Sequence, residues 1–311
     1  MTVLGLDTSN YTTSAALFDG GQGFSLGKLL EVPEGALGLR QSDALFQHVK
    51  RLPGLIHELR EQGKLENIEA VGASTRPREV EGSYMPCFLA GESAGRILAD
   101  TLDVPFFPCS HQQGHLAAAA WSAGREELLK APLLAWHLSG GTTELLLVEP
   151  EGNMPRATKL GGTSDISAGQ LIDRTGKLLG LAFPAGKALD ALAEQSNEET
   201  CFSIKISDFA FSLSGMENQA QAMIRKGASD RETARFVLCT LCDLLVRATA
   251  EAQRRYPGLP VLCSGGVSSN RMLCRRMAQA CGAVFASPEY AADNAMGTAI
   301  LAYRALEGGN G

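Results

Sequence analysis

Two histidines four residues apart are the strongest chemical feature of the sequence. His111 and His115 stand in the run Ser-His-Gln-Gln-Gly-His, and the whole chain contains only five histidines. The run follows an apolar stretch typical of a β-strand and opens an alanine-rich stretch typical of an α-helix. Because residues i and i+4 lie on one face of a helix, both imidazoles can reach a single metal ion. The spacing therefore predicts a metal site; the alternative is a pair of helix-surface histidines.

A metal site needs further ligands, and the sequence offers one good candidate. Asp293, in the run Ala-Ala-Asp-Asn-Ala-Met-Gly, stands at the expected start of the last helix. Aspartate also serves well as a helix N-cap, and spacing alone does not choose between these roles. The pattern is not that of an HExxH metalloprotease, because Gln112 occupies the position of the general-base glutamate. Proteolysis by that mechanism is disfavoured.

The elements that must position these residues occur twice along the chain. Residues 4–21 and 133–152 each form an apolar strand, a turn of small residues and a second apolar strand. A third strand and a helix follow each hairpin, and strands then alternate with helices. In the first half the expected strands are 23–32, 68–75 and 104–110, and the expected helices are 42–62 and 93–102. In the second half the expected strands are 154–162, 260–266 and 283–287, and the expected helices are 167–179, 233–254 and 270–280. Two βββαβαβα halves predict a duplicated α/β fold whose domains flank a ligand cleft.

The repeat sets the expected domain boundaries. We expect residues 1–130 to form the first domain, which carries the two histidines, and residues 131–311 to form the second. The last helix, at about residues 293–308, is expected to pack back towards the first domain. The turns at residues 8–10 and 139–143 would point into the cleft, where backbone N–H groups and hydroxyls suit phosphate or carboxylate oxygens. The alternative is that glycine and serine are simply good turn formers.

Composition bounds the cellular context. The chain has 311 residues, of which 45% are hydrophobic and 20% charged, enough for two domains with cores. No apolar run is long enough to span a bilayer, and the N-terminus lacks the charged region of a signal peptide, so we expect a cytoplasmic protein. Eight cysteines, most of them in apolar runs, suit reduced, buried thiols, and the pair Cys239 and Cys242 favours core packing over metal binding.

The net charge of −6 disfavours a protein that grips nucleic acid unaided. Positive charge gathers locally at only one place, formed by Arg254, Arg255, Arg271, Arg275 and Arg276. If the ligand is an RNA, partner subunits are expected to supply much of the binding.

Several motifs in one order give the chain a family resemblance. It resembles the tRNA threonylcarbamoyladenosine synthase family (TsaD in bacteria), formerly described as glycoproteases or O-sialoglycoprotein endopeptidases. The likeness runs nearly end to end. Its motifs here are LGLDTS at 4–9, His111 with His115, SGGT at 139–142, Ala168-Gly169 with Asp173, KLLGL at 177–181, FPAG at 183–186, DFAFSLSG at 208–215, GGVSSNR at 265–271 and Asp293-Asn294.

The resemblance implies a fold, a metal and a reaction. The family has the duplicated actin and hexokinase-like (ASKHA) fold, and it holds one divalent metal per subunit, usually iron(II) and sometimes zinc(II). By analogy the ligands are His111, His115 and Asp293. The family transfers the threonylcarbamoyl group from threonylcarbamoyl-AMP to the exocyclic amine of the adenine beside the tRNA anticodon. TsaB-like and TsaE-like partner proteins are implied as well.

The resemblance also implies which residues contact the adenylate. Asp173 would accept hydrogen bonds from the ribose hydroxyls, Gly186 would let the backbone approach the nucleotide, and Asn270 would bond to the adenylate. The full expected set is His137, Leu138, Ser139, Gly140, Gly141, Asp173, Gly186 and Asn270.

The chain departs from the family pattern at four places. Residues 10–13 read Asn-Tyr-Thr-Thr where the family has an acidic Asp-Glu pair, and residues 75–79 replace a Gly-Pro-Gly turn. Thr142 replaces a histidine, and Arg174 replaces a lysine. The kept metal and adenylate positions leave open a paralogous carbamoyl or acyl transferase with a similar adenylate donor and a different acceptor. They disfavour a third reading, a non-catalytic nucleotide-binding scaffold.

Overall fold

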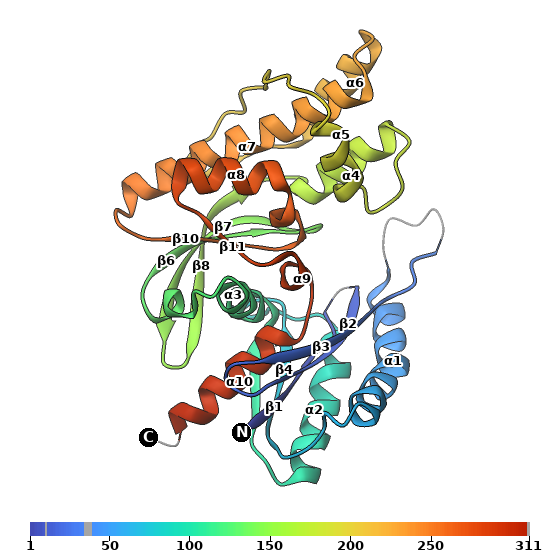
Figure 1. The fold of residues 1–311 in the computed structure, drawn as a ribbon, viewed down its shortest axis with the longest axis vertical. Helices are drawn as coiled ribbons and strands as arrows, with labels where there is room; N and C mark the ends of the chain where they lie inside the picture. Colours follow the sequence, from blue (N-terminus) through green and yellow to red (C-terminus); the bar gives the residue numbers. More distant parts are fainter. Residues whose placement is uncertain (10, 34–38, 310–311) are drawn as a thin grey trace. The chain divides into compact units, whose positions relative to one another are not determined.

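The computed structural model describes residues 1–9, 11–33 and 39–309, so Asn10 of the first turn lies outside the described residues. The chain forms two compact units, each built on a mixed β-sheet with helices (Figure 1). The first unit comprises Met1–Lys130, Glu149–Ala157 and Asp293–Gly311, and the second comprises Ala131–Val148 and Thr158–Ala292. None of the helices in the described part of the chain has the length and apolar character needed to cross a bilayer.

The first unit follows the predicted βββαβαβα order. Its elements are β1 (Thr2–Asp7), β2 (Thr12–Phe18), β3 (Gly23–Leu29), α1 (Gln41–Glu61), β4 (Ile68–Arg76), α2 (Phe88–Leu102), β5 (Phe106–Ser110) and α3 (His111–Ser122), with the short 3-10 helix η1 (Glu126–Lys130) after them. The sheet order is β3-β2-β1-β4-β5, with β1 antiparallel to β2 and parallel to β4. The C-terminal helix α10 (Met296–Gly309) packs on β1 and β4 of this same sheet.

Helices cover both faces of the first sheet, which explains why β1 reads as a nearly continuous apolar run. Leu4 and Leu6 belong to a core cluster with residues of α1 and α2. The alternate residue Val3 packs with Ala302 of α10. Gly5 permits close approach of that helix, because a Cβ there would lie 2.5 Å from the backbone nitrogen of Ala299.

The second unit repeats the three strands and then carries additional helices. Its elements are β6 (Leu133–Leu138), β7 (Thr143–Glu151), β8 (Met154–Thr163), α4 (Ala168–Leu178), α5 (Gly186–Ala193), β9 (Ala210–Phe211), α6 (Ser214–Arg225), α7 (Asp230–Arg255), β10 (Val261–Ser264), η2 (Gly266–Ser269), α8 (Arg271–Cys281), β11 (Val284–Phe285) and α9 (Pro288–Ala291). The sheet order is β11-β10-β6-β7-β8-β9. The tip of the β7–β8 hairpin, residues 149–157, belongs to the first unit.

The core of the second unit lies between this sheet and its helices. Trp136 is fully buried and donates its indole N–H to the hydroxyl of Thr249 on α7 at 2.8 Å. Cys239 and Cys242 on the same helix are buried in this core, and all eight cysteines are free thiols. The sequence did not predict α5 or α6, and it placed the start of α2 at residue 93, five residues after its start at Phe88.

Candidate functional site

The two histidines stand in the first two turns of α3, directly after β5. Ser110 caps this helix: its hydroxyl accepts the backbone N–H of Gln113, and the Gln113 side chain accepts the backbone N–H of Ser110 at 2.8 Å. This reciprocal capping box fixes where the helix begins. Gln113 also donates its side-chain amide to the carbonyl of Pro155 at 2.9 Å. His111 and His115 therefore occupy one face of a helix whose first turn is fixed by the hydrogen bonds of Ser110 and Gln113.

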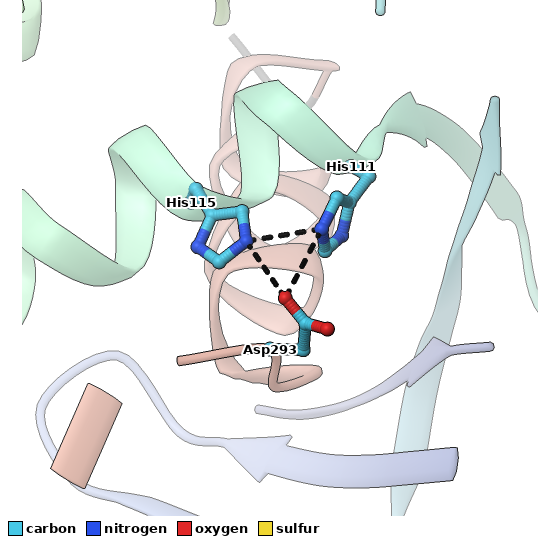
Figure 2. A group of neighbouring side chains, drawn as sticks. All are labelled: His111, His115 and Asp293. Atoms are coloured by element: carbon cyan, nitrogen blue, oxygen red, sulfur yellow. Dashed lines mark hydrogen bonds and ion pairs between the residues drawn. The ribbon is translucent and has the colours of Figure 1, made fainter. Parts of the chain in front are cut away.

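Asp293 completes a three-residue group with these histidines (Figure 2). Its Oδ1 lies 3.3 Å from Nε2 of His115 and 3.5 Å from Nε2 of His111, and the two Nε2 atoms are 3.0 Å apart. One ligand atom from each residue lies within 4.8 Å of the other two. Among the residues that the structure describes, this is the only such group of three or more His, Cys, Asp or Glu side chains. The structure thus brings together all three residues expected as metal ligands.

The segment before α10 shows which of two roles Asp293 takes, metal ligand or helix N-cap, which the sequence left open. Asn294, its neighbour, accepts the backbone N–H of Met296 at 3.0 Å, where the helix begins. Asp293 instead turns its carboxylate to the two imidazoles. Asn294 therefore makes the capping bond at the start of this helix, and the Asp293 carboxylate contacts the two histidines.

Asp7 adds a fourth ionisable side chain to this cluster. Its Oδ2 lies 2.9 Å from Nδ1 of His111, and its Oδ1 accepts the backbone N–H of Ser9 at 2.8 Å. Burial alone would lower the pKa of His111, but the charges of Asp7 and Asp293 outweigh burial and raise the pKa to about 10. Burial and the charge on His111 lower the pKa of His115. His111 is thus the more basic of the two imidazoles and His115 the less basic.

The carboxylates stay ionised. Burial opposes ionisation of Asp293, but the hydrogen bonds and charges of His111 and His115 hold its pKa well below the usual range. The pKa of Asp7 is likewise lowered, because the attraction of His111 outweighs the cost of burial. Two imidazole nitrogens and one carboxylate oxygen are ligands that suit iron(II) and zinc(II). The donor atoms, their convergence and the negative charges of Asp7 and Asp293 fit a divalent metal ion that keeps open positions.

The turn expected to bind the adenylate lies at the end of β6 in the second unit. The Ser139 N–H donates to the carbonyl of Thr142 at 2.8 Å, and the Ser139 hydroxyl accepts the Thr142 N–H at 3.1 Å. Gly140 and Gly141 are exposed at its tip, whereas His137 and Leu138 are buried in the strand. The turn packs on the start of α4, since a Cβ at Gly169 would lie 2.6 Å from the Cα of Gly140.

Asp173 and Gly186 lie close together. Asp173, half-buried on α4, accepts the backbone N–H of Ala185 at 2.8 Å, and Gly186 follows as the first residue of α5. Burial raises the pKa of Asp173, although the Ala185 N–H partly opposes this shift. The hydrogen bond ties the carboxylate to the backbone next to Gly186.

Asn270 caps α8 and is held by a residue that the sequence did not single out. Its Oδ1 accepts the Leu273 N–H at 2.9 Å, and its Nδ2 donates to Asp190 at 2.8 Å. Asp190 is only 7% exposed and also accepts a bond from the Arg271 guanidinium at 3.1 Å. Asp190 follows Gly186 by four residues on α5, so the two lie on one face of that helix. This spacing was the one sequence signal that could have pointed to Asp190 as a site residue. Asn270 and Ala168, at the start of α4, line one small apolar cavity.

Comparison with known proteins identifies the family. A family model described as tRNA N6-adenosine threonylcarbamoyltransferase (TsaD) matches residues 38–300. A relative of that name from Thermus thermophilus is 31% identical over 316 residues, covering 98% of this chain and 93% of its own length. The chain belongs to the tRNA N6-adenosine threonylcarbamoyltransferase family. The family resemblance seen in the motifs is confirmed, and TsaD-family proteins are transferases by name.

Solved structures confirm the predicted fold class. Full-length HypF in its phosphate- and nucleotide-bound form matches with a TM-score of 0.66 at 15% identity, over 98% of this chain and 46% of that chain. A ROK family glucokinase from Streptomyces griseus matches with a TM-score of 0.51 at 12% identity, over 98% of this chain and 100% of that chain. At these identities the likeness shows the fold alone, and that fold is the actin and hexokinase-like one.

The basic cluster of this TsaD-family chain is largely neutralised. Arg271 and Arg275 both bind Glu194, at 2.9 and 3.1 Å. Arg276 pairs with Glu199, and Arg255 pairs with Asp208. Arginines engaged in this way present little net positive charge to a phosphate backbone.

Proposed function

We propose that this chain is a tRNA N6-adenosine threonylcarbamoyltransferase that uses threonylcarbamoyl-AMP as the donor. The observation that carries the proposal is the convergence of His111, His115 and Asp293 within 4.8 Å in a chain of this family. In the reaction, the exocyclic nitrogen of the adenine beside the anticodon bonds to the carbamoyl carbon. The bond from that carbon to the phosphate oxygen breaks, AMP leaves with the electron pair, and the nitrogen loses a proton.

His111, His115 and Asp293 would hold one iron(II) or zinc(II) ion. When bound, such an ion supplies Lewis-acid polarisation of a carbonyl oxygen. The residues themselves keep two ligand nitrogens and an ionised carboxylate facing one point, with His115 only 4% exposed. His111 and His115 lie on α3, and Asp293 lies in the short segment between α9 and α10 of the structure. Placement of two ligands on a helix gives the group more rigidity than a site built on loops alone.

The residues of the second unit would hold the adenylate. The N–H groups of Gly140 and Gly141, at the exposed tip of the turn, suit the phosphate. Asp173, oriented by the Ala185 N–H at 2.8 Å, would accept a ribose hydroxyl. Gly186 would admit the nucleotide close to the backbone. Asn270, held by Asp190 at 2.8 Å, would donate or accept a hydrogen bond with the adenylate.

TsaB-like and TsaE-like partners and the tRNA complete the proposal. A net charge of −6 and the ion pairing of Arg271 and Arg275 disfavour strong tRNA binding by this chain alone. We infer that partner subunits supply part of the tRNA contact.

The test is transfer from threonylcarbamoyl-AMP to an unmodified transcript of a tRNA that decodes ANN codons, with iron(II) and the partner subunits present. We expect the modified adenosine with the wild-type chain and a loss of at least about 100-fold with His111→Ala. His57→Ala is the matched control, because His57 is an exposed histidine on α1. Equal activity in the two variants would contradict the proposal.

A second candidate is a paralogous transferase with the same donor and another acceptor. Tyr11 and Thr12 stand where the family has its acidic pair, and Thr13 is buried with its hydroxyl 2.8 Å from Nδ1 of His48. No carboxylate is therefore available at residues 11–13. Binding of the adenylate without transfer to tRNA, in the same assay, would favour this candidate over the first.

A further inference from the structure

Asp7 meets His111 on the edge of the imidazole that faces away from the other two ligands. Asp7 ends β1, is 1% exposed, and places Oδ2 2.9 Å from Nδ1 of His111. The opposite nitrogen, Nε2, faces His115 and Asp293 (Figure 2). Asp7 is therefore not one of the three converging ligands. It contacts the ligand His111 at Nδ1, the ring nitrogen opposite the ligand atom Nε2.

A carboxylate in this place has a definite effect on the ring. Since it accepts a hydrogen bond from Nδ1–H, it leaves the lone pair of Nε2 for a metal ion, and it fixes the ring's orientation. We propose that Asp7 is the positioning residue of the metal centre, which selects the tautomer and the rotamer of His111 that bind the ion through Nε2. This inference rests on the proposed metal function of His111, His115 and Asp293.

The surroundings of Asp7 leave it little freedom to move. Its Oδ1 accepts the Ser9 N–H at 2.8 Å, and its carbonyl accepts the Ser14 hydroxyl at 3.1 Å. The next residue, Thr8, donates its hydroxyl to the carbonyl of Cys87 at 2.9 Å and accepts the Gly91 N–H at 3.0 Å. The end of β1 is thus tied to β2 and to the start of α2.

The start of α2 also contacts the histidine ring itself. The ring of Phe88 lies against that of His111, with centroids 6.2 Å apart. The ring is therefore held by an aromatic contact and by a charge-assisted hydrogen bond. A site of this kind needs such support, because ligand geometry depends on the residues behind the ligands.

Cobalt(II) binding tests the proposal with a readout other than activity. Asp7→Asn keeps the shape of the side chain and removes its charge, and we expect cobalt(II) to bind roughly 10- to 100-fold more weakly. The matched control is Asp19→Asn, since Asp19 is an exposed carboxylate of the same unit that accepts the N–H groups of Gly21 and Gln22. That control is expected to bind cobalt(II) like the wild-type chain.

The outcomes separate this proposal from the metal site itself. A wild-type chain that binds no cobalt(II) would contradict the metal centre, and the role of Asp7 with it. A wild-type chain that binds cobalt(II), together with Asp7→Asn of equal affinity, would overturn the role of Asp7 alone. Thermal unfolding followed by circular dichroism shows that the variants compared are folded.

A second measurement needs no variant of Asp7. Long-range proton–nitrogen NMR spectra of the zinc(II)-loaded wild-type chain report the protonated nitrogen of each of its five histidines. We expect Nδ1 of His111 to carry the proton and Nε2 to be bound to zinc(II). A His111 ring protonated at Nε2, with Nδ1 on the metal, would overturn the proposal.

Discussion

Gly114 of α3 lies directly against Gly297 of α10. A Cβ at Gly297 would stand 1.7 Å from the carbonyl oxygen of Gly114, so the two helices cross with no side chain between them. Gly114 lies between His111 and His115 along the chain, and Gly297 comes four residues after Asp293. The contact between two glycines is therefore what brings the carboxylate to the histidines.

Gly297→Ala should separate the ligands. The added methyl group meets backbone, which cannot rotate away, so α10 must shift from α3. We expect a loss of about 1–3 kcal/mol in the free energy of unfolding, measured with urea, together with weaker cobalt(II) binding. Gly309→Ala is the control, because Gly309 belongs to the same helix and a Cβ there would meet nothing within 4 Å. Full metal affinity in Gly297→Ala would contradict this account of the helix crossing.

Asp190→Ala should weaken nucleotide binding without touching the nucleotide's own expected contacts. It removes the acceptor that holds Asn270 Nδ2 at 2.8 Å and leaves the Arg271 guanidinium with Glu194 as its carboxylate partner. We expect AMP affinity, measured by calorimetry, to fall about tenfold, in line with a lost hydrogen bond to a charged group. Asp243→Ala, which breaks the Asp243–Arg247 pair on α7, should leave AMP affinity unchanged. An unchanged affinity in Asp190→Ala would refute the role given to Asp190.

Asp165 should make the stability of the second unit depend on pH. Burial opposes its ionisation, but hydrogen bonds from the Ser212 hydroxyl and the Leu213 N–H outweigh burial and hold its pKa well below the ordinary 3.8. A lowered folded-state pKa gives stability that is complete above pH 3.8 and is lost as pH falls towards the folded-state pKa.

Urea unfolding of Asp165→Asn at two pH values measures this effect. At pH 7 we expect the variant to be less stable than the wild-type chain by about 1 kcal/mol, a modest figure because the side chain is exposed. At pH 3 the difference should be smaller. A gap that stays constant or widens on acidification would contradict the assignment.

The local features of the site could be predicted from sequence. A four-residue spacing places His111 and His115 on one helix face whatever the rest of the fold, and the repeated hairpins predicted both sheets. Asp293 was a candidate ligand with a rival role, because aspartate is itself a good N-cap. Only the packed helix shows that Asn294 makes the capping bond and that Asp293 faces the histidines.

The residues that support the site could not be predicted. Asp7 reads as the polar end of a buried strand, and its contact with His111 spans 104 residues of sequence. Asp190 and Asn270 are 80 residues apart. Contacts of this kind arise from tertiary packing, and neither periodicity nor residue type in one sequence reports them.

Metal dependence of the transfer reaction tests the central claim most directly. The chain is stripped with a chelator, and threonylcarbamoyl transfer to tRNA is then measured while iron(II) is added in fractions of one equivalent. The account predicts no transfer from the stripped chain, full recovery at one iron(II) per chain, and no recovery in Asp293→Ala, which lacks the carboxylate 3.3 Å from His115. Transfer by the stripped wild-type chain at the full rate would contradict it.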